Sequence, residues 1–133
     1  MNSFEYTDKL WDIFTNDSTL ISLLNVNVND DSSYVLKFRQ EDIAPEEFSP
    51  DNLDFIAFYF SDANITINDF MNKGLLRIDI YSSIRDNVAP IRKRIVDLIH
   101  ENFDERIRAE GQYSSGIVNV YKYRLEFTPL IFT

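Results

Sequence analysis

The stretch that most constrains the fold is residues 74–103, which joins a strand pattern to a helix pattern. Leu76, Ile78 and Ile80 alternate with more polar neighbours, and this two-residue period indicates a strand with one face buried and the other partly polar. Farther along, apolar residues recur at steps of three and four, which predicts a helix of about four turns over residues 87–103. The apolar stripe consists of Val88, Ile91, Ile95, Leu98, Ile99 and Phe103. We therefore expect a long amphipathic helix that lies over a sheet.

Two short helices are predicted ahead of the first strand. Apolar residues cluster near positions 10–14 and again near positions 20–24, and a polar break at residues 15–18 separates them. Asn16 or Asp17 in this break can cap the second helix, because its side-chain oxygen can accept a hydrogen bond from a free amide of the first turn. We expect two helical pieces and not one continuous helix.

The remainder of the chain alternates predicted strands with loops. Strands are predicted at residues 34–39, 53–60, 76–81, 104–112 and 117–127. Residues 61–73 are interpreted as a turn with a short strand-like excursion, and Gly116 favours a turn before the last long strand. The order of elements predicts an α+β fold in which the helices pack on a mainly antiparallel sheet, with residues 1–133 as a single domain.

Charge is divided unevenly along the chain. Residues 1–72 contain 3 basic and 14 acidic side chains, a net charge of −11, whereas residues 73–133 contain 10 basic and 8 acidic, a net charge of +2. The whole chain has a net charge of −9, which argues against ordinary nucleic-acid binding, because that needs basic side chains on the phosphates. Such a chain can attract copies of itself head to tail, and solubility alone is the alternative explanation.

No signal for export or for membrane insertion is found. No apolar run approaches the roughly 18 to 20 residues needed to cross a bilayer. The N-terminus has neither a basic leader nor an apolar signal core. We therefore expect a protein that is made in the cytoplasm and has no membrane partner.

No pattern typical of a reactive site is found either. His100 is the one histidine, and a histidine near a helix end more often interacts with the helix C-terminus or borders the core than acts in catalysis. The chain has no cysteine, and its three glycines are isolated from one another, so thiol chemistry and a glycine-rich phosphate loop are excluded. Residues 25–31, NVNVNDD, lack the glycine and the terminal glutamate of an EF-hand, and a solvated loop is the favoured interpretation. We predict a protein that is not an enzyme and holds no cofactor or metal ion.

Residues 92–94 form a basic triplet within the predicted long helix. On a helix these side chains point in different directions, and Lys93 can pair with Asp97 one turn later. We therefore favour a solvated, internally paired face over a phosphate-binding site.

Three segments together carry a family resemblance. They are LWDIFTNDSTLISLL, LLRIDIYSSIRDNVAPIRKRIVDLI and VYKYRLEFTPLIFT. They combine a helix-break-helix start, a strand that ends in a pattern like I-D-I-Y, a helix on that strand and a final strand that returns to the sheet. In these features the chain resembles the tail-completion or tail-terminator (neck) proteins of long-tailed bacteriophages and prophages, over about half to two thirds of its length.

The resemblance implies a structural virion protein that forms a ring, commonly a hexamer, at the head-tail junction. Such a ring caps the tail tube and lets DNA pass without specific binding. The implied partners are copies of the chain itself, the tail tube protein and a head-side neck protein. The implied location is the tail or neck of the virion, after synthesis in the cytoplasm of the bacterial host.

Two segments depart from the family pattern and are the candidate interfaces. Residues 40–52 form a long acidic loop, and residues 130–133 form an apolar chain end, which normally needs a surface on which to dock. An acidic ring lumen would repel the phosphates of DNA. The candidate interface residues are Glu41, Asp42, Glu46, Glu47 and Asp51 in the loop and Leu130, Ile131 and Phe132 in the chain end. An alternative stays open for each segment. The acidic loop could be merely solvated, and the chain end could be a last strand packed into the core of its own chain.

Tail termination is not the only function that these features allow. A head-completion or adaptor protein of the neck is the nearest alternative within the same resemblance. A small acidic binding or inhibitor module that mimics DNA is the alternative from a different class, and an enzyme is the least favoured. A ring in solution would support a neck protein, whereas a monomer that binds a basic partner would support the acidic module.

Overall fold

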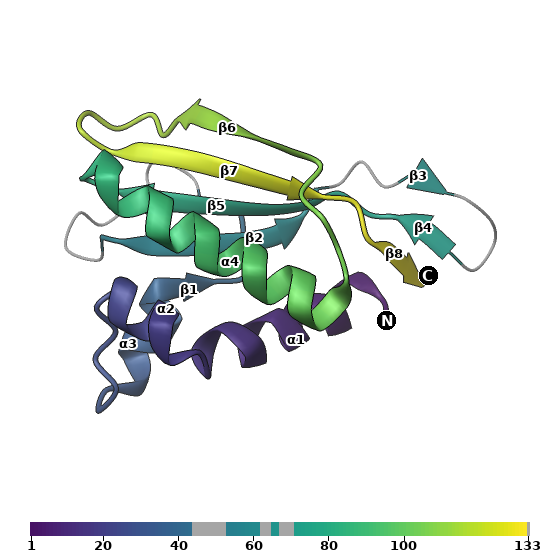
Figure 1. Cartoon of the computed structure of the whole chain (residues 1–133), viewed down its shortest axis with the longest axis horizontal. Helices are drawn as coiled ribbons and strands as arrows, with labels where there is room; N and C mark the ends of the chain where they lie inside the picture. Colours follow the sequence, from purple (N-terminus) through teal and green to yellow (C-terminus); the bar gives the residue numbers. More distant parts are fainter. Residues whose placement is uncertain (44–52, 62–64, 67–70, 133) are drawn as a thin grey trace.

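The computed structural model describes residues 1–43, 53–61, 65–66 and 71–132, and for residues 65–66 and 71–73 it describes the backbone alone. Helices pack against a mostly antiparallel sheet, which confirms the predicted α+β fold class (Figure 1).

Three short helices open the chain. They are α1 Ser3–Thr15, α2 Ser18–Leu23 and α3 Asp31–Lys37. Each begins at a side-chain cap, because Asn2, Asp17 and Asp30 accept hydrogen bonds from backbone amides of the following turn at 2.8, 3.0 and 3.0 Å. The predicted break between the first two helices is confirmed, and Asp17 is the residue that caps the second.

The strand predicted at residues 34–39 is wrong for most of its length. The chain stays helical to Lys37, and only Phe38–Arg39 forms a short strand, β1. The apolar run in this segment is too short to separate a helical period from a strand period. The Asp30 cap starts a helix just ahead of it, and Tyr34 then packs against the core from that helix.

Five strands form the main sheet in the order β1-β2-β5-β7-β6. After β1 they are β2 Phe55–Phe60, β5 Leu76–Ser82, β6 Ala109–Ser114 and β7 Tyr121–Phe127. β1 and β2 are parallel, and all other neighbours in this sheet are antiparallel. The strands predicted at residues 104–112 and 117–127 begin later than predicted, at Ala109 and Tyr121. Residues 115–120 form the connection ahead of β7, with Gly116 and Asn119 in left-handed conformations (φ 79° and 65°).

β5 is the central strand of the main sheet. All of its residues are buried except Arg77, which is half-buried. The face of β5 that was expected to be partly polar is therefore buried although it carries polar side chains. Asp79 lies on this face and has no exposed surface.

A second, smaller sheet continues from the end of the main one (Figure 1). Its strands are β3 Ile65–Thr66, β4 Met71–Lys73 and β8 Leu130–Phe132, all antiparallel. The backbone amide of Gly74 donates to the carbonyl of Pro129 at 2.9 Å where the two sheets meet. The strand-like excursion expected within residues 61–73 corresponds to β3 and β4.

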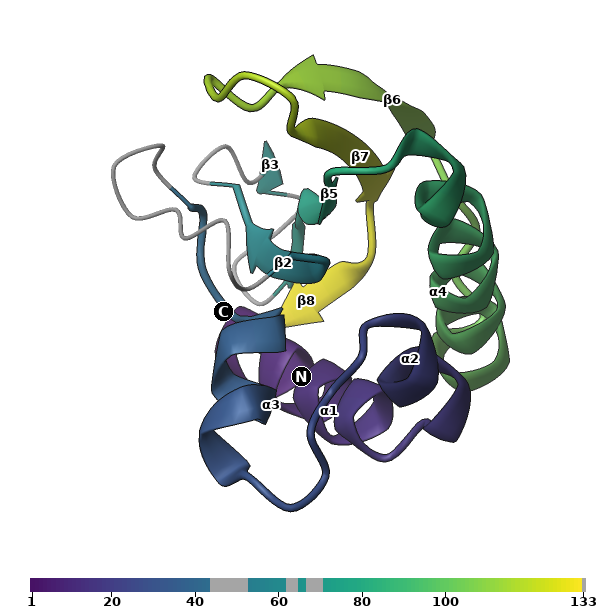
Figure 2. The same cartoon turned by 90° about the vertical axis from the view of Figure 1, so that its left-hand side faces the viewer.

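The predicted long helix is α4, Val88–Phe103, preceded by a 3-10 turn, η3, at Arg85–Asn87. The apolar stripe is buried except for Phe103, which is half-buried. α4 ends at Asp104, whose left-handed conformation (φ 52°) lets its amide donate to the carbonyl of His100 at 3.0 Å. Together with α1 and α2, α4 covers one face of the main sheet, and the core lies between these layers (Figure 2).

Candidate assembly surfaces

The acidic loop is described only at its start. Glu46, Glu47 and Asp51 lie outside the described residues. Glu41 is exposed, and its Oε1 accepts hydrogen bonds from Arg39 Nε and Nη2 at 3.3 and 3.1 Å. Asp42 is also exposed. Glu41 is therefore paired within its own chain, and the role of the loop in a lumen or an interface remains a prediction.

The apolar chain end divides into buried and exposed side chains. Ile131 is 2% exposed and belongs to the core, so it is not available at the surface as an interface residue. The reason is geometric: β8 pairs with β4, and alternate side chains of a strand point to opposite faces. Leu130 and Phe132 consequently point away from the core, and each is 54% exposed.

The start of the chain lies beside its end. The backbone amide of Phe132 donates to the carbonyl of Met1 at 2.8 Å, and α1 contacts β8. Figure 1 shows the two termini next to each other. Met1 and Phe4 are themselves exposed, Phe4 by 79%. We use the name terminal apolar patch for the four exposed apolar residues near the paired chain ends, Met1, Phe4, Leu130 and Phe132.

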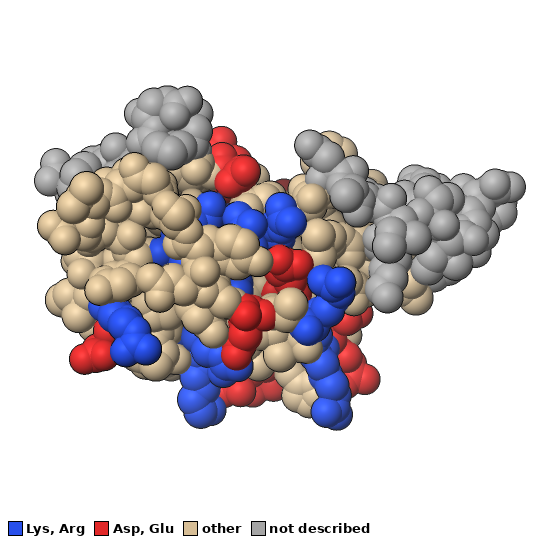
Figure 3. Space-filling model, turned by 90° about the horizontal axis from the view of Figure 1, so that it is seen from above, with Lys and Arg blue, Asp and Glu red and all other residues tan. Residues whose placement is uncertain are grey.

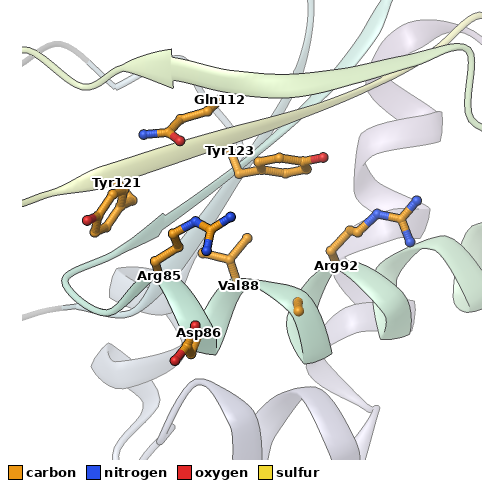
Figure 4. A pocket seen from close by; sticks show the side chains of 8 residues that line it. Arg85, Asp86, Val88, Arg92, Gln112, Tyr121 and Tyr123 are labelled. Carbon is orange, nitrogen blue, oxygen red and sulfur yellow. The ribbon is translucent and has the colours of Figure 1, made fainter.

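A pocket opens between the start of α4 and the strands β6 and β7. Its volume is about 500 Å³. It is lined by Arg85, Asp86, Val88, Ala89, Arg92, Gln112, Tyr121 and Tyr123. Figure 4 shows Arg85 reaching from η3 over Val88 toward the two tyrosines, whereas Asp86 points away from the strands. We call this the helix-start pocket.

The two arginines of the helix-start pocket differ in their partners. Arg92 Nε and Nη2 donate to both carboxylate oxygens of Glu110 at 2.7 and 3.0 Å, and this hydrogen bonding raises the pKa of Arg92 above its usual value. The guanidinium of Arg85 makes no hydrogen bond or ion pair with any residue that the structure describes. Arg85 is therefore a cation available to an anionic group from outside.

The sheet face opposite the helices contains a cluster of charged side chains. Arg124 Nε and Nη2 donate to Asp79 Oδ1 and Oδ2 at 2.8 and 3.3 Å, and the Tyr59 hydroxyl donates to Asp79 Oδ2 at 2.8 Å. Lys122 Nζ lies 3.7 Å from the same oxygen, and the Tyr113 ring lies 4.5 Å below the Arg124 guanidinium. We call Tyr59, Asp79, Lys122 and Arg124 the sheet charge cluster. It ties β2, β5 and β7 together.

The ionisable groups of this cluster shift one another's pKa values. Burial raises the pKa of the Tyr59 hydroxyl, and the nearby charge of Asp79 raises it further. Burial alone would lower the pKa of Arg124, but its hydrogen bonds to Asp79 and the attraction between the two charges raise it above the usual value. Seen from the side of β6 and β7, basic and acidic side chains are interleaved on the described part of the surface (Figure 3). This surface therefore lacks the single-sign basic area that phosphate binding needs.

An ion pair ties α4 to the start of α2. Arg94 Nε and Nη2 donate to Asp17 Oδ2 and Oδ1 at 3.0 and 2.6 Å, and the hydrogen bond from Arg94 lowers the pKa of Asp17. The pairing expected between Lys93 and Asp97 is confirmed at 2.9 Å. The basic triplet is thus occupied by internal partners, since Arg92 is bound to Glu110.

No reactive constellation forms in the part of the chain that the structure describes. His100 is exposed, and its Nδ1 lies 3.9 Å from Asp104 Oδ1. Among the described residues, no three His, Asp or Glu side chains gather closely enough to hold a metal ion. No helix in the described ranges has the length and apolarity needed to span a membrane.

A scan against protein-family models and a search of curated proteins each found no match for this chain.

Two features of these surfaces could not be found from the sequence. The terminal apolar patch adds Met1 and Phe4 to the predicted chain end, and only the pairing of the two termini brings them together. The helix-start pocket joins residues 85–92 to residues 112–123, which no spacing rule connects. The one feature of the sequence that pointed toward this pocket was the basic character of residues 85–94.

Proposed function

We propose that this chain is a structural subunit that assembles with copies of itself into a ring of the tail-terminator type, in which the ring caps a phage tail tube and lets DNA pass. The observation on which the self-assembly rests is the terminal apolar patch. The assignment to a phage neck rests on the resemblance of the three sequence segments given above. Tail termination is preferred to head completion on the same ground.

The terminal apolar patch supports assembly because its side chains are ordered yet exposed. The backbone on both sides is held by the pairing of β8 with β4 and by the hydrogen bond from Phe132 to Met1. Covering a large apolar side chain that is about half exposed contributes on the order of 1 kcal/mol. Leu130, Phe132 and Phe4 together therefore offer a few kcal/mol to a neighbouring copy, and docking needs little additional ordering of the chain.

The difference between two sides of the molecule is compatible with a head-to-tail contact. The outer side of α1 presents Glu5, Asp8 and Asp12, which are all exposed. The helix α1 lies in the lower part of the molecule in Figures 1 and 2. The exposed strand β6 and the start of α4 lie toward the top in both views. A contact between two different faces of successive copies continues around a ring if the rotation closes.

The test of self-assembly is the mass of the purified protein by size-exclusion chromatography with light scattering, followed by negative-stain imaging. The double variant Leu130→Ser with Phe132→Ser should lower the assembled fraction at a given concentration while the far-UV spectrum stays native. Val118→Ser is the matched control, because Val118 is also apolar and exposed but lies in the β6–β7 connection. Equal loss of assembly in the control and the double variant would contradict the role given to the patch.

Deleting residues 130–133 is a harsher perturbation that separates two roles of the chain end. Because Ile131 belongs to the core, we expect the truncated chain to lose stability as well as assembly. The double serine variant leaves Ile131 in place and should lose assembly alone. If truncation lowered the melting temperature but left assembly intact, β8 would be internal core only, and the patch would have no role between copies.

The exposed acidic side chains of α1 favour a second candidate, an acidic binding or inhibitor module that mimics DNA. In that case the purified chain would be a monomer that binds a basic partner, and Glu5, Asp8 and Asp12 would be the contact residues. Replacing these three residues with neutral ones would then abolish partner binding. For a ring subunit, the same protein would associate with itself in the absence of any partner.

A further inference from the structure

The helix-start pocket has the character of a docking site with no occupant among the described residues. Its floor is formed by Val88 and Ala89 and by the rings of Tyr121 and Tyr123, and Arg85 stands at its edge (Figure 4). Apolar walls with a free cation fit a segment that presents an apolar side chain next to a carboxylate. An occupant of that description exists in the chain itself.

The loop between α2 and α3 has this chemistry. Residues 27–31 read Asn-Val-Asn-Asp-Asp, and Val28 is 57% exposed. Asp30 caps α3 with its carboxylate, whereas the Asp31 carboxylate makes no hydrogen bond or ion pair with any residue in the described ranges. An exposed valine in the loop and a free carboxylate at the first residue of α3 therefore stand three residues apart in the chain.

The loop is held in one shape by its own hydrogen bonds. The Asn27 amide donates to Ser33 Oγ at 2.9 Å, and the Asn29 amide donates to Asn27 Oδ1 at 3.1 Å. The Asp30 amide donates to the carbonyl of Asn27 at 3.1 Å. A loop that is ordered before binding loses less conformational freedom on binding than a mobile loop does. Its insertion into a pocket therefore has a lower entropic cost.

The loop cannot be the occupant of the pocket in its own chain, because the two lie on opposite sides of the molecule. The loop adjoins α3 at the bottom of Figures 1 and 2, whereas the start of α4 and β6 lie toward the top in both views. Two copies placed one above the other would bring the loop of one copy to the pocket of the next. Such a contact uses two different surfaces and leads from copy to copy around a ring if the rotation between copies closes.

We propose that residues 27–31 of one copy dock into the helix-start pocket of the next copy, with Val28 against the tyrosines and Val88 and with Asp31 beside Arg85. This inference rests on the proposed function, since it names the contact that joins successive subunits. Asp86 points away from the strands and does not oppose Asp31, and Arg92 is already neutralised by Glu110. The charge of Arg85 is therefore left for the incoming carboxylate.

A charge swap tests the proposal in full-length protein. Arg85→Glu and Asp31→Arg should each raise the Kd for self-association by about tenfold or more, because each variant places like charges in contact. The double variant, Arg85→Glu with Asp31→Arg, should return the Kd to near that of the wild type. An equimolar mixture of the two single variants should also associate, because every contact between unlike copies then joins opposite charges.

The matched control is Arg106→Glu, which makes the same charge change at an exposed arginine beyond the end of α4. It should leave the Kd within about threefold of the wild type. Sedimentation velocity over a concentration series measures each Kd, and thermal melts confirm that each variant folds. Because Asp31 lies in the first turn of α3, Asp31→Asn provides a milder variant, and Val28→Ser tests the apolar half of the contact.

The possible results separate this proposal from the one on which it rests. A wild-type protein that stays a monomer at all concentrations would overturn both. A wild-type protein that associates while Arg85→Glu and Asp31→Arg have no greater effect than the control would overturn the docking contact and leave ring assembly standing. Failure of both the double variant and the mixture to recover association would also overturn the pairing of Asp31 with Arg85.

Discussion

Replacing Asp79 with leucine removes the acceptor at the centre of the sheet charge cluster. Asp79 has no exposed surface, and it accepts two hydrogen bonds from Arg124 and one from Tyr59. Lys122 Nζ lies 3.7 Å from the same carboxylate. After the change, two cations would remain on the sheet face with no carboxylate between them, and the side chains of Arg124 and Lys122 are each only 12% exposed.

The expected cost follows from that geometry. Removing one partner of a buried ion pair typically costs about 3 to 5 kcal/mol, because the other charge is left uncompensated. Arg124 keeps its contact with the Tyr113 ring and its hydrogen bond to the Tyr59 hydroxyl, so we expect a loss near the lower end, about 3 kcal/mol. For 133 residues the entropy of unfolding is about 0.28 kcal/mol/K, and the melting temperature should fall by about 10 °C.

The assay is urea unfolding at one fixed protein concentration, followed by circular dichroism. Four proteins form a double-mutant cycle: the wild type, Asp79→Leu, Arg124→Met and the double variant. The double variant should regain at least half of the stability that Asp79→Leu loses, because apolar side chains then face each other. Asp97→Ala is the control, since it breaks the exposed pair with Lys93 and should cost no more than about 0.5 kcal/mol.

A small effect would refute this reasoning. If Asp79→Leu cost as little as the exposed control, the carboxylate would be solvated and would not join the strands. If the double variant were less stable than the wild type by the sum of the two single-variant costs, the two side chains would act independently. Either result would mean that burial of charge on this face does not stabilise the strand register.

Three other predictions concern the helix layer and the sheet junction. Asp17→Asn keeps a capping oxygen but loses the ion pair with Arg94. Because the pKa of Asp17 is lowered in the folded state, the ionised carboxylate stabilises the fold above the unfolded-state pKa, which is near 4. This stabilisation is lost as the pH falls through the folded-state pKa. The difference in unfolding free energy between the wild type and the variant, measured by urea unfolding, should therefore be present at pH 7 and should shrink as the pH falls below about 4. A difference that did not change with pH would contradict the pairing. Gly74→Ala places a Cβ 2.6 Å from a ring atom of Phe60 and should cost about 1 to 3 kcal/mol, and unchanged stability would show that the ring moves aside freely. Ile131→Ala should cost about 2 to 4 kcal/mol by the same measurement, and a loss below about 1 kcal/mol would contradict its place in the core.

The parts of the fold that local patterns determine could be predicted. The alternation at residues 76–80 and the apolar stripe from Val88 to Phe103 correspond to β5 and α4, because a single buried face imposes its period on neighbouring residues. The cap at Asp17 could be predicted for the same reason, since the residues that determine a helix start lie within one turn of it. At residues 34–37 the apolar run was too short for its period to be read, and the cap at Asp30 decided the outcome.

Features that depend on strand register could not be predicted. Asp79 and Arg124 are 45 residues apart, and their side chains meet only because β5 and β7 pair with these two residues opposite each other. The sequence showed charged residues on the polar face of two strands, but not that this face would be buried. The burial of Asp79 therefore depends on which strands become neighbours, which no local period encodes.

The candidate surfaces were predicted in part. Strand alternation alone suggests that Leu130 and Phe132 share a face and that Ile131 lies on the other, but only the pairing of β8 with β4 decides which face is covered. The helix-start pocket depends on β6 lying beside the start of α4, and the sequence had placed the start of that strand several residues too early. Charge division along the chain was visible, whereas the exposure of Glu5, Asp8 and Asp12 together on the outer side of α1 required the fold.

The mass of the purified wild-type chain in solution tests the central claim most directly. A copy of this chain has a mass of 15.6 kDa. Light scattering after size-exclusion chromatography at micromolar concentration should give a multiple of that mass, and negative-stain images of the same fraction should show closed rings. A mass of one chain across the whole concentration range would contradict the account.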